Sequence, residues 1–324
     1  SGSTATATIG ISTTSSTIIN DRIAALRTGI VETGMAAGNA IGMTAARLWG
    51  QAFGAQAEQD RRQGIAGYDA DTYGMIVGMD ADMTDAFRAG IAFSYASTDV
   101  DSQNVNTGNT DINSYQIALY GDYDLGGDMF VNAQLGYMRS NIDTLRLNVG
   151  GVAGNSARGD FYSNQYIVRA ELGRDIRASR NAVLTPSLFV NYNHISFENY
   201  TETGAGGLAL RNVDTDNMNI FELGVNVKNE WTFMDGMGGY IKPNIHGGFR
   251  YDFVNDEVQT SAALVGGGAA FQTTGFEPAK HTINVGAGLS WDAGNNWEVS
   301  TNYDFEYKDD YDAHSGYVRV GYKF

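Results

Sequence analysis

Apolar and polar residues alternate along this chain in segments of about ten residues, and this pattern constrains the fold more than any other feature. In the segment 297–307, Trp297 and Tyr303 fall on one parity with the other apolar and aromatic residues. Glu298 and Asn302 fall on the opposite parity. A period of two places alternate side chains on opposite faces of a β-strand. Since no window approaches the roughly 18 consecutive apolar residues of a membrane helix, the pattern predicts an all-β chain.

Twelve segments carry this alternation, and an even number suits a closed antiparallel barrel. They lie at 47–57, 73–79, 87–95, 115–123, 129–137, 162–172, 184–192, 221–227, 241–253, 281–291, 297–307 and 318–324. The composition agrees, because 41 Gly, 18 Tyr and 15 Phe stand against only 3 Pro. Aromatic residues favour strands, whereas Pro interrupts them.

The links between these segments alternate in length. Five are short and read as tight turns, at 82–85, 124–127, 178–181, 234–238 and 292–296. Five are long and polar or Gly-rich, at 58–70, 98–111, 143–160, 198–216 and 255–280, and only the link 308–312 breaks the rule. Short turns on one rim and long loops on the other are typical of outer-membrane barrels.

Alternation alone does not say which face is wet, because a soluble barrel or sandwich alternates as well. The length of the segments, the aromatic residues near their ends and the mixed charges on the polar face favour an apolar outer surface. The prediction is therefore a 12-stranded transmembrane β-barrel with a polar lumen. The lumen charges that we single out are Arg169, Glu171, Glu222, Arg250, Asp304 and Glu306.

The first 46 residues differ from the rest, so we divide the chain into 1–46, an N-terminal linker with a helix, and 47–324, the barrel. Residues 1–16 form a Ser/Thr/Ala/Gly tract with little to pack, and 18–46 has the Ala-rich composition of a helix. Twelve strands enclose a lumen that side chains do not fill, and a slim helix inside it would plug the pore. The alternative is a loose amphipathic linker.

Four residues of the predicted pore helix are of interest. Ile23 and Leu26 are spaced for one helix face, and Arg22 and Arg27 lie beside them. We expect the two arginines to pair with lumen acids and to help retain the helix.

The chemistry-bearing residues predict no catalytic, cofactor or metal site. With 37 Asp+Glu and 21 Lys+Arg the formal charge is −16, which argues against nucleic-acid binding. There is no Cys, and the four histidines are isolated and lack metal-ligand spacing. No G-x-S-x-G motif occurs, and the acidic run 309–312 is interpreted as solvated.

The order and spacing of several segments resemble the C-terminal translocator domain of autotransporters, the type V secretion proteins of Gram-negative bacteria. Residues 20–27 resemble the pore helix of that family, 47–54 its first strand, 118–123 its fourth, 170–173 its sixth and 200–204 the loop after its seventh. The C-terminal segment 317–324 fits the terminal β-signal of outer-membrane proteins, with Val318, Val320, Tyr322 and Phe324 on one face.

The resemblance implies an integral protein of the Gram-negative outer membrane that has no enzymatic activity. It implies that periplasmic chaperones and the outer-membrane assembly machinery deliver and insert the barrel, with the terminal strand pairing as an exposed edge. It also implies export of an N-terminal passenger to the cell surface, contact with membrane lipid and lipopolysaccharide, and a monomer.

Some members of the family cut the pore helix between two adjacent Asn residues. This chain has no such pair near residue 20, so self-cleavage by that chemistry is not expected; Asn20-Asp21 is the nearest candidate and is better interpreted as a helix cap. Nothing before residue 17 could form a passenger, so the chain is expected to be a translocator unit without its cargo.

Two other functions remain open from the sequence. A porin or substrate-specific channel would use the loop 255–280 as a constriction, but would have no use for the N-terminal helix. An outer-membrane lipase would need a Ser–His pair that the sequence does not reveal.

Overall fold

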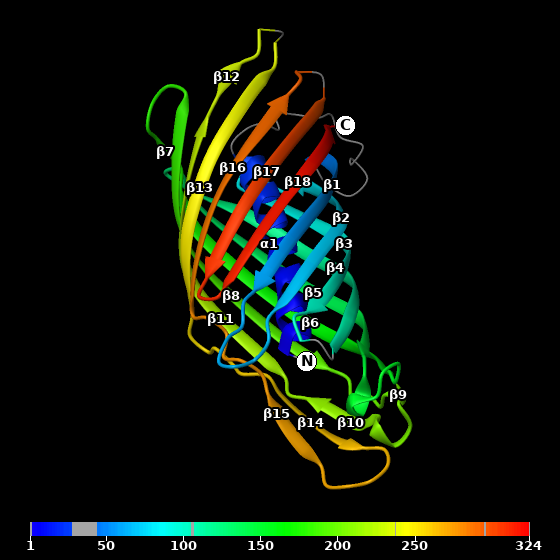
Figure 1. The fold of residues 1–324 in the computed structure, drawn as a ribbon. Helices are drawn as coiled ribbons and strands as arrows, with labels where there is room; N and C mark the ends of the chain where they lie inside the picture. Colours follow the sequence, from blue (N-terminus) through cyan, green and yellow to red (C-terminus); the bar gives the residue numbers. More distant parts are fainter. Residues whose placement is uncertain (1, 28–43, 105–106, 237, 295, 324) are drawn as a thin grey trace.

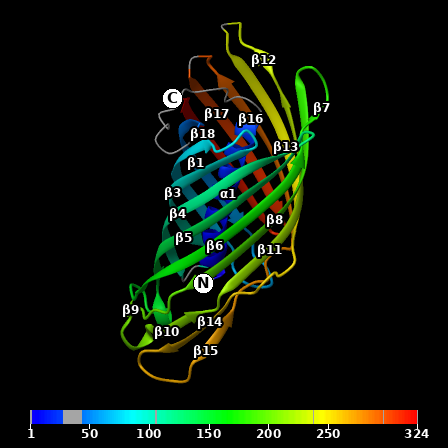
Figure 2. The same ribbon diagram turned by 180° about the vertical axis from the view of Figure 1, so that it is seen from behind.

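Twelve long antiparallel strands close into one barrel around an N-terminal helix (Figures 1 and 2). This computed structural model describes residues 2–27, 44–104, 107–236, 238–294 and 296–323. The helix is α1 (Gly2–Arg27). The strands of the barrel are β1 (Thr44–Gln59), β2 (Tyr68–Asp82), β3 (Phe87–Ser102), β4 (Thr107–Gly126), β5 (Met129–Arg146), β6 (Ala157–Arg174), β8 (Ala182–Phe197), β11 (Met218–Trp231), β13 (Tyr240–Asp252), β16 (His281–Asp292), β17 (Trp297–Lys308) and β18 (Tyr311–Lys323). The predicted fold class is confirmed.

Each barrel strand pairs with its neighbour in the chain, and the first and last strands close the ring. β1 and β18 run antiparallel from Arg47 opposite Lys323 to Gln59 opposite Tyr311. Because hydrocarbon offers no hydrogen bonds, an open sheet edge in a membrane costs several kcal/mol per orphan backbone group. Closure removes both edges at once. The predicted segments fall on these strands, apart from Phe253, which follows the last residue of β13, and Phe324, which lies outside the described residues.

The two ends of the barrel differ as the link lengths predict. At the short-turn end, β7 (Ile176–Arg177) and β12 (Phe233–Met234) lengthen two hairpins, which project past the rim in Figure 1. At the long-loop end, three short strands form a separate sheet beyond the barrel. The elements of the long loops are η1 (Val149–Gly151), β9 (Thr203–Gly204), η2 (Gly206–Leu208), β10 (Leu210–Thr215), β14 (Gln259–Leu264) and β15 (Phe271–Thr274).

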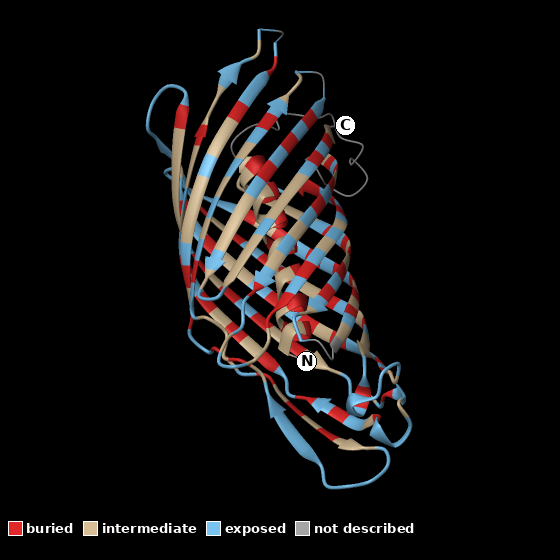
Figure 3. Ribbon diagram, in the orientation of Figure 1, coloured by how far each residue is buried: buried red, intermediate tan, exposed pale blue. Residues whose placement is uncertain are grey.

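Apolar side chains cover the outside of the barrel. More and less exposed residues alternate along many of the strands in Figure 3. The outward parity carries large apolar residues on every side of the ring. Examples are Met75, Phe93, Leu119, Leu135, Val168, Leu188, Val225, Ile245, Val285, Tyr303 and Val318. Such an unbroken apolar band is stable only against lipid.

A row of carboxylates limits this band at the long-loop end. Asp71 lies opposite Asp99, Asp99 opposite Asp111, Asp111 opposite Asp143, and Asp143 opposite Asp160. All five belong to the outward parity of their strands. Because charged side chains are costly on the lipid face, the hydrocarbon must end below this row.

The helix begins earlier than the sequence predicts. The expected helix was 18–46 with a loose tract at 1–16, whereas α1 begins at Gly2 and ends at Arg27. Residues 28–43 lie outside the described residues, and 44–46 belong to β1. Hydroxyl groups in the supposed tract donate to backbone carbonyls of the helix itself, Thr6 to Gly2 at 3.0 Å and Thr8 to Thr4 at 2.8 Å. These bonds satisfy polar groups that would otherwise compete with the helix.

Within the described residues, no helix combines the length and the apolar character needed to cross a membrane.

The lipid-facing assignment predicts a cost that depends on depth. Leu135, which is 55% exposed near the middle of β5, and Met129, which is 39% exposed at the short-turn rim, share one face of that strand. We expect Leu135→Arg to lower the free energy of unfolding in vesicles by about 2–4 kcal/mol and Met129→Arg by about 0–1 kcal/mol. Equal costs in denaturant titrations would contradict a lipid-facing β5.

Candidate functional site

The site is the lumen of the barrel together with the helix inside it. α1 lies along the pore and spans about 39 Å at 1.5 Å per residue. Its first residue, Gly2, lies beside Gly275 at the long-loop end. Its last residue, Arg27, contacts Asp175 at the short-turn end. The helix therefore runs from the long-loop end to the short-turn end in chain order.

One side of the lumen packs against the helix through apolar side chains. Ile11, Ile18, Ile19 and Ile23 of α1 are buried in a cluster with inward-facing residues of β1 to β5. The wall contributes Trp49, Ile76, Ala92, Ile112, Ala118, Met138 and Ile142, among others. Burying one such aliphatic side chain contributes about 1.5–3 kcal/mol. The sequence predicted a polar lumen throughout, so this apolar half is a correction: a helix of this composition is held by packing as well as by charge.

The carboxylate of Asp80 joins the helix to the wall at the short-turn end. Arg22 Nε lies 2.9 Å from Asp80 Oδ2, and Arg22 Nη2 lies 3.2 Å from Oδ1, so the guanidinium is bidentate. Arg22 is 2% exposed and Asp80 1%. Glu298 lies 3.6 Å from Arg22 Nη1, and Arg47 Nη1 lies 3.7 Å from Asp80. A buried pair of this kind is strongly destabilised when one partner is removed.

Two aromatic side chains hold Asp80 from the wall side. The hydroxyl of Tyr120 donates to Asp80 Oδ2 at 3.1 Å, and Trp49 Nε1 donates to the Tyr120 oxygen at 2.9 Å. Both rings lie over glycines. A Cβ on Gly78 would lie 2.5 Å from the Trp49 ring, and a Cβ on Gly90 would lie 2.3 Å from the Tyr120 ring. Glycine at these positions makes the close approach of the two rings possible.

Arg27 makes a second contact between helix and wall, nearer the rim. Its Nη1 lies 3.2 Å from Asp122 Oδ1 and its Nε lies 3.1 Å from Asp175 Oδ2. The guanidinium also lies over the ring of Phe130, 3.2 Å from its centroid. Both arginines singled out in the sequence thus meet acids of the wall, and Ile23 and Leu26 are buried between them.

The six lumen charges chosen from the sequence face inward but do not hold the helix. Arg250 contacts Glu222 at 2.8 Å and Glu306 at 2.6 Å. Arg169 lies 3.6 Å from Glu171, and Asp304 lies 2.6 Å from His246 Nε2. These are pairs within the wall. The acids that contact the helix arginines are instead Asp80, Asp122, Asp175 and Glu298.

Alternation contained the signal that would have found Asp80 and Asp122. Met79 faces outward on β2, so its neighbour Asp80 lies on the inward face of that strand. Leu119 faces outward on β4, so Asp122, three residues further along, lies on the inward face. Asp80 lies between the predicted segment 73–79 and the turn 82–85, so it was assigned to no strand face. Asp122 lies within the predicted segment 115–123 but was not singled out among its inward residues.

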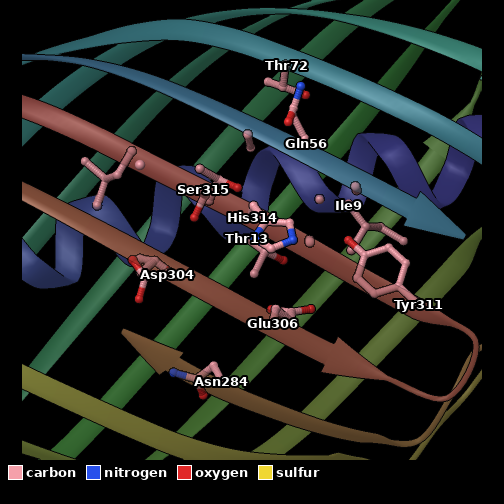
Figure 4. A pocket seen from close by; sticks show the side chains of 18 of the residues that line it. Ile9, Thr13, Gln56, Thr72, Asn284, Asp304, Glu306, Tyr311, His314 and Ser315 are labelled. Atoms are coloured by element: carbon pink, nitrogen blue, oxygen red, sulfur yellow. The ribbon is translucent and has the colours of Figure 1, made fainter. Parts of the chain in front are cut away.

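A cavity of about 160 Å³, whose lining includes charged and hydroxyl side chains, lies on the other side of the helix. Figure 4 shows Thr13 of α1 together with Asp304 and Glu306 of β17 around it. Arg250 also lines it, and the hydroxyl of Tyr317 donates to Asp21 Oδ2 of the helix at 2.8 Å. The lumen is therefore dry on one side of α1 and polar on the other.

The terminal strand presents its alternate residues to the outside. Val318 and Val320 are exposed, and the ring of Tyr322 lies 4.9 Å from that of Trp297 on the neighbouring strand. Phe324, the last residue of the predicted β-signal, lies outside the described residues.

The residues that the structure describes contain no group of three or more His, Cys, Asp or Glu side chains suited to hold a metal ion. His246 pairs with Asp304 in the lumen, and His314 contacts the hydroxyl of Tyr303 on the outside.

The Asp80 contact predicts a specific loss of stability. Asp80→Asn leaves Arg22 buried beside a neutral amide, so we expect the free energy of unfolding to fall by about 3–5 kcal/mol and α1 to become cleavable by added protease. The control is Asp85→Asn, an exposed carboxylate at the same end, which should change stability by less than about 0.5 kcal/mol.

A double variant separates charge from packing in this test. Combining Asp80→Asn with Arg22→Met removes the buried guanidinium that has lost its bidentate partner, so part of the lost stability should return. If Asp80→Asn behaved like Asp85→Asn in denaturant titrations, the pair would not hold the helix.

The position of α1 also predicts the conductance of the pore. Deleting residues 1–46 should raise single-channel conductance in planar bilayers, because the deletion empties the lumen. Deleting Gly266–Gly268 from a long loop, by contrast, should leave conductance unchanged. An unchanged conductance after the first deletion would show that the helix does not limit the pore.

Comparison with known proteins agrees with this geometry. The model of the family described as autotransporter β-domain matches residues 48–304. The chain is 27% identical to outer membrane protein B of Rickettsia prowazekii across 99% of its own length and 21% of that protein. The chain thus spans about a fifth of the length of this relative.

Solved structures of the same fold include translocator domains. The translocator domain of autotransporter NalP from Neisseria meningitidis has a TM-score of 0.71 and 16% identity, and the match covers 98% of this chain and 99% of that one. The β-domain of the Bordetella autotransporter BrkA has a TM-score of 0.65 and 15% identity, and covers 86% of this chain and 100% of that one.

Proposed function

The chain belongs to the autotransporter β-domain family, and from this membership we propose that it exports an N-terminal passenger and anchors it at the cell surface. Its barrel is integral to the outer membrane, as its family, its relatives and its closed apolar wall indicate. Because the chain spans about a fifth of its curated relative, the passenger itself and its activity are part of the proposal.

The direction of α1 is the observation that carries the proposal. The helix enters the lumen at the long-loop end with Gly2 and reaches the short-turn end with Arg27. A passenger joined ahead of residue 1 would therefore continue outward from the long-loop end. Long loops face outward in outer-membrane barrels, so this end would face the exterior of the cell.

The helix fits the role of the segment left in the pore after export. The helix is held along the wall by its apolar contacts and by the contacts of Arg22 and Arg27. We propose that residues 1–46 serve as plug and linker and that 47–324 form the translocator barrel, with β1 already beginning at Thr44. A porin is the weaker proposal, because a helix seated this way obstructs diffusion.

The terminal strand supports a proposed role in assembly. Val318, Val320 and Tyr322 lie on the outward face of β18, whose pairing with β1 closes the ring. Before closure this strand is an edge on which the assembly machinery would pair by β-augmentation. We propose periplasmic chaperones, lipid and lipopolysaccharide as the other partners of a monomeric barrel.

We propose transport without enzymatic activity, and a helix that stays joined to its passenger. The bond between Asn20 and Asp21 lies within α1. Asn20 is followed by Asp21 and not by a second Asn, so cleavage by Asn cyclisation is not expected at this bond.

The export proposal is tested with a fusion. A small soluble reporter joined ahead of residue 1 should become accessible to protease on intact Gram-negative cells. Its control lacks residues 318–324 and should leave the reporter protected, because β18 can no longer close the barrel. A reporter that stays protected while the complete barrel is inserted and shifts on a gel after boiling would contradict export but not the fold.

A further inference from the structure

One hairpin at the short-turn end carries three arginines that no acid neutralises. Arg174 ends β6, Arg177 ends β7, and Arg180 lies in the turn that leads to β8. All three are exposed, and among the described residues none of their guanidinium groups contacts a carboxylate. We call 174–180 the basic hairpin. It projects past the rim of the barrel at the top of Figure 1.

The single acid of the basic hairpin is already engaged. Asp175 Oδ2 accepts from Arg27 of α1 at 3.1 Å, and Asp175 Oδ1 accepts from the hydroxyl of Thr185 at 2.6 Å. It points into the rim and leaves the three arginines uncompensated on the outside. A local excess of positive charge is unusual in a chain of net charge −16.

Apolar side chains lie beside this charge. Ile176 is exposed within the basic hairpin, and the neighbouring hairpin exposes Phe233 and Met234, the latter 81%. The pairing of β8 with β11 makes the two hairpins neighbours. Arg174 follows the lipid-facing Leu172 on the outward face of the same strand, so the charge begins where the apolar band ends.

We propose that the basic hairpin binds the headgroups of anionic glycerophospholipids in the leaflet around the short-turn end. The proposed orientation makes this the periplasmic leaflet, but the binding itself rests only on the barrel being in a membrane. Guanidinium groups bind phosphate bidentately, and the exposed Ile176, Phe233 and Met234 reach into the same interface. The outward face at the opposite end carries the row of carboxylates instead, so anionic lipid is favoured at one end only.

The adjacent apolar residues favour lipid over an acidic protein surface as the occupant. A protein partner of opposite charge would be recognised by the arginines alone, whereas a bilayer interface accommodates both cationic groups and apolar side chains at one depth. Each arginine near an anionic surface contributes about fivefold in affinity.

The test compares two triple variants of the complete chain. In one, Arg174, Arg177 and Arg180 are changed to Gln; in the control, the exposed Arg61, Arg158 and Arg211 of the long-loop end are changed to Gln. Binding of phosphatidylglycerol and of phosphatidylcholine to the detergent-folded protein is titrated by native mass spectrometry. Heat-modifiable migration on a gel identifies the folded species.

The basic-hairpin variant should bind phosphatidylglycerol at least about tenfold more weakly, with phosphatidylcholine binding unchanged. The control should stay within about twofold of the parent. Changing the same three arginines to Lys should weaken binding less than the change to Gln, because the charge remains while the bidentate contact with phosphate is lost. Unchanged phosphatidylglycerol binding in the folded basic-hairpin variant, or an equal loss in the control, would overturn the assignment. Unchanged lipid binding together with slower insertion in cells would assign the hairpin to an acidic protein partner instead.

Discussion

Every feature of this structure depends on the pairing of backbone groups inside a medium that supplies no hydrogen bonds. That requirement forces β1 onto β18 and turns the sheet into a ring. A ring of this strand number cannot fill its own interior with side chains. The lumen must then contain water or another segment of the chain. Closure, the apolar outer band and the internal helix are therefore consequences of one constraint rather than three separate designs.

The helix uses two kinds of interaction in two regions of the lumen. Aliphatic packing against β1 to β5 stabilises the helix in the lumen but does not fix its depth, because hydrophobic contacts are non-directional. The contacts of Arg22 and Arg27 fix depth, since a bidentate guanidinium has one preferred position. The cavity on the opposite side leaves α1 without comparable packing there. The apolar contacts thus determine which side of the lumen the helix lies against, and the arginine contacts determine its position along the pore axis.

The sequence predicts the barrel better than it predicts the plug, for physical reasons. Alternation is a property of single strands and survives without knowledge of partners, so strand number, link lengths and outward face all followed from it. The first half of α1 did not, because Ser and Thr are weak helix formers until their hydroxyls bond back to the helix, as Thr8 does. The sequence does not identify the partner of Arg22, because Asp80 is distant along the chain. Which of the inward acids meets Arg22 depends on where the helix lies in the lumen.

The carboxylate of Asp80 has a consequence for the order of assembly. Its oxygens take bonds from Tyr120, which belongs to the wall, and from Arg22, which does not. If the barrel closed before the helix entered the lumen, the buried carboxylate of Asp80 would lack its bidentate partner Arg22. A helix that entered later would have to bring the charged Arg22 into a closed barrel. The favourable order is that α1 enters the lumen first and that β1 then pairs with β18 around it. Entry of the helix and closure of the barrel would then be coupled, because Arg22 supplies the charge that pairs with Asp80.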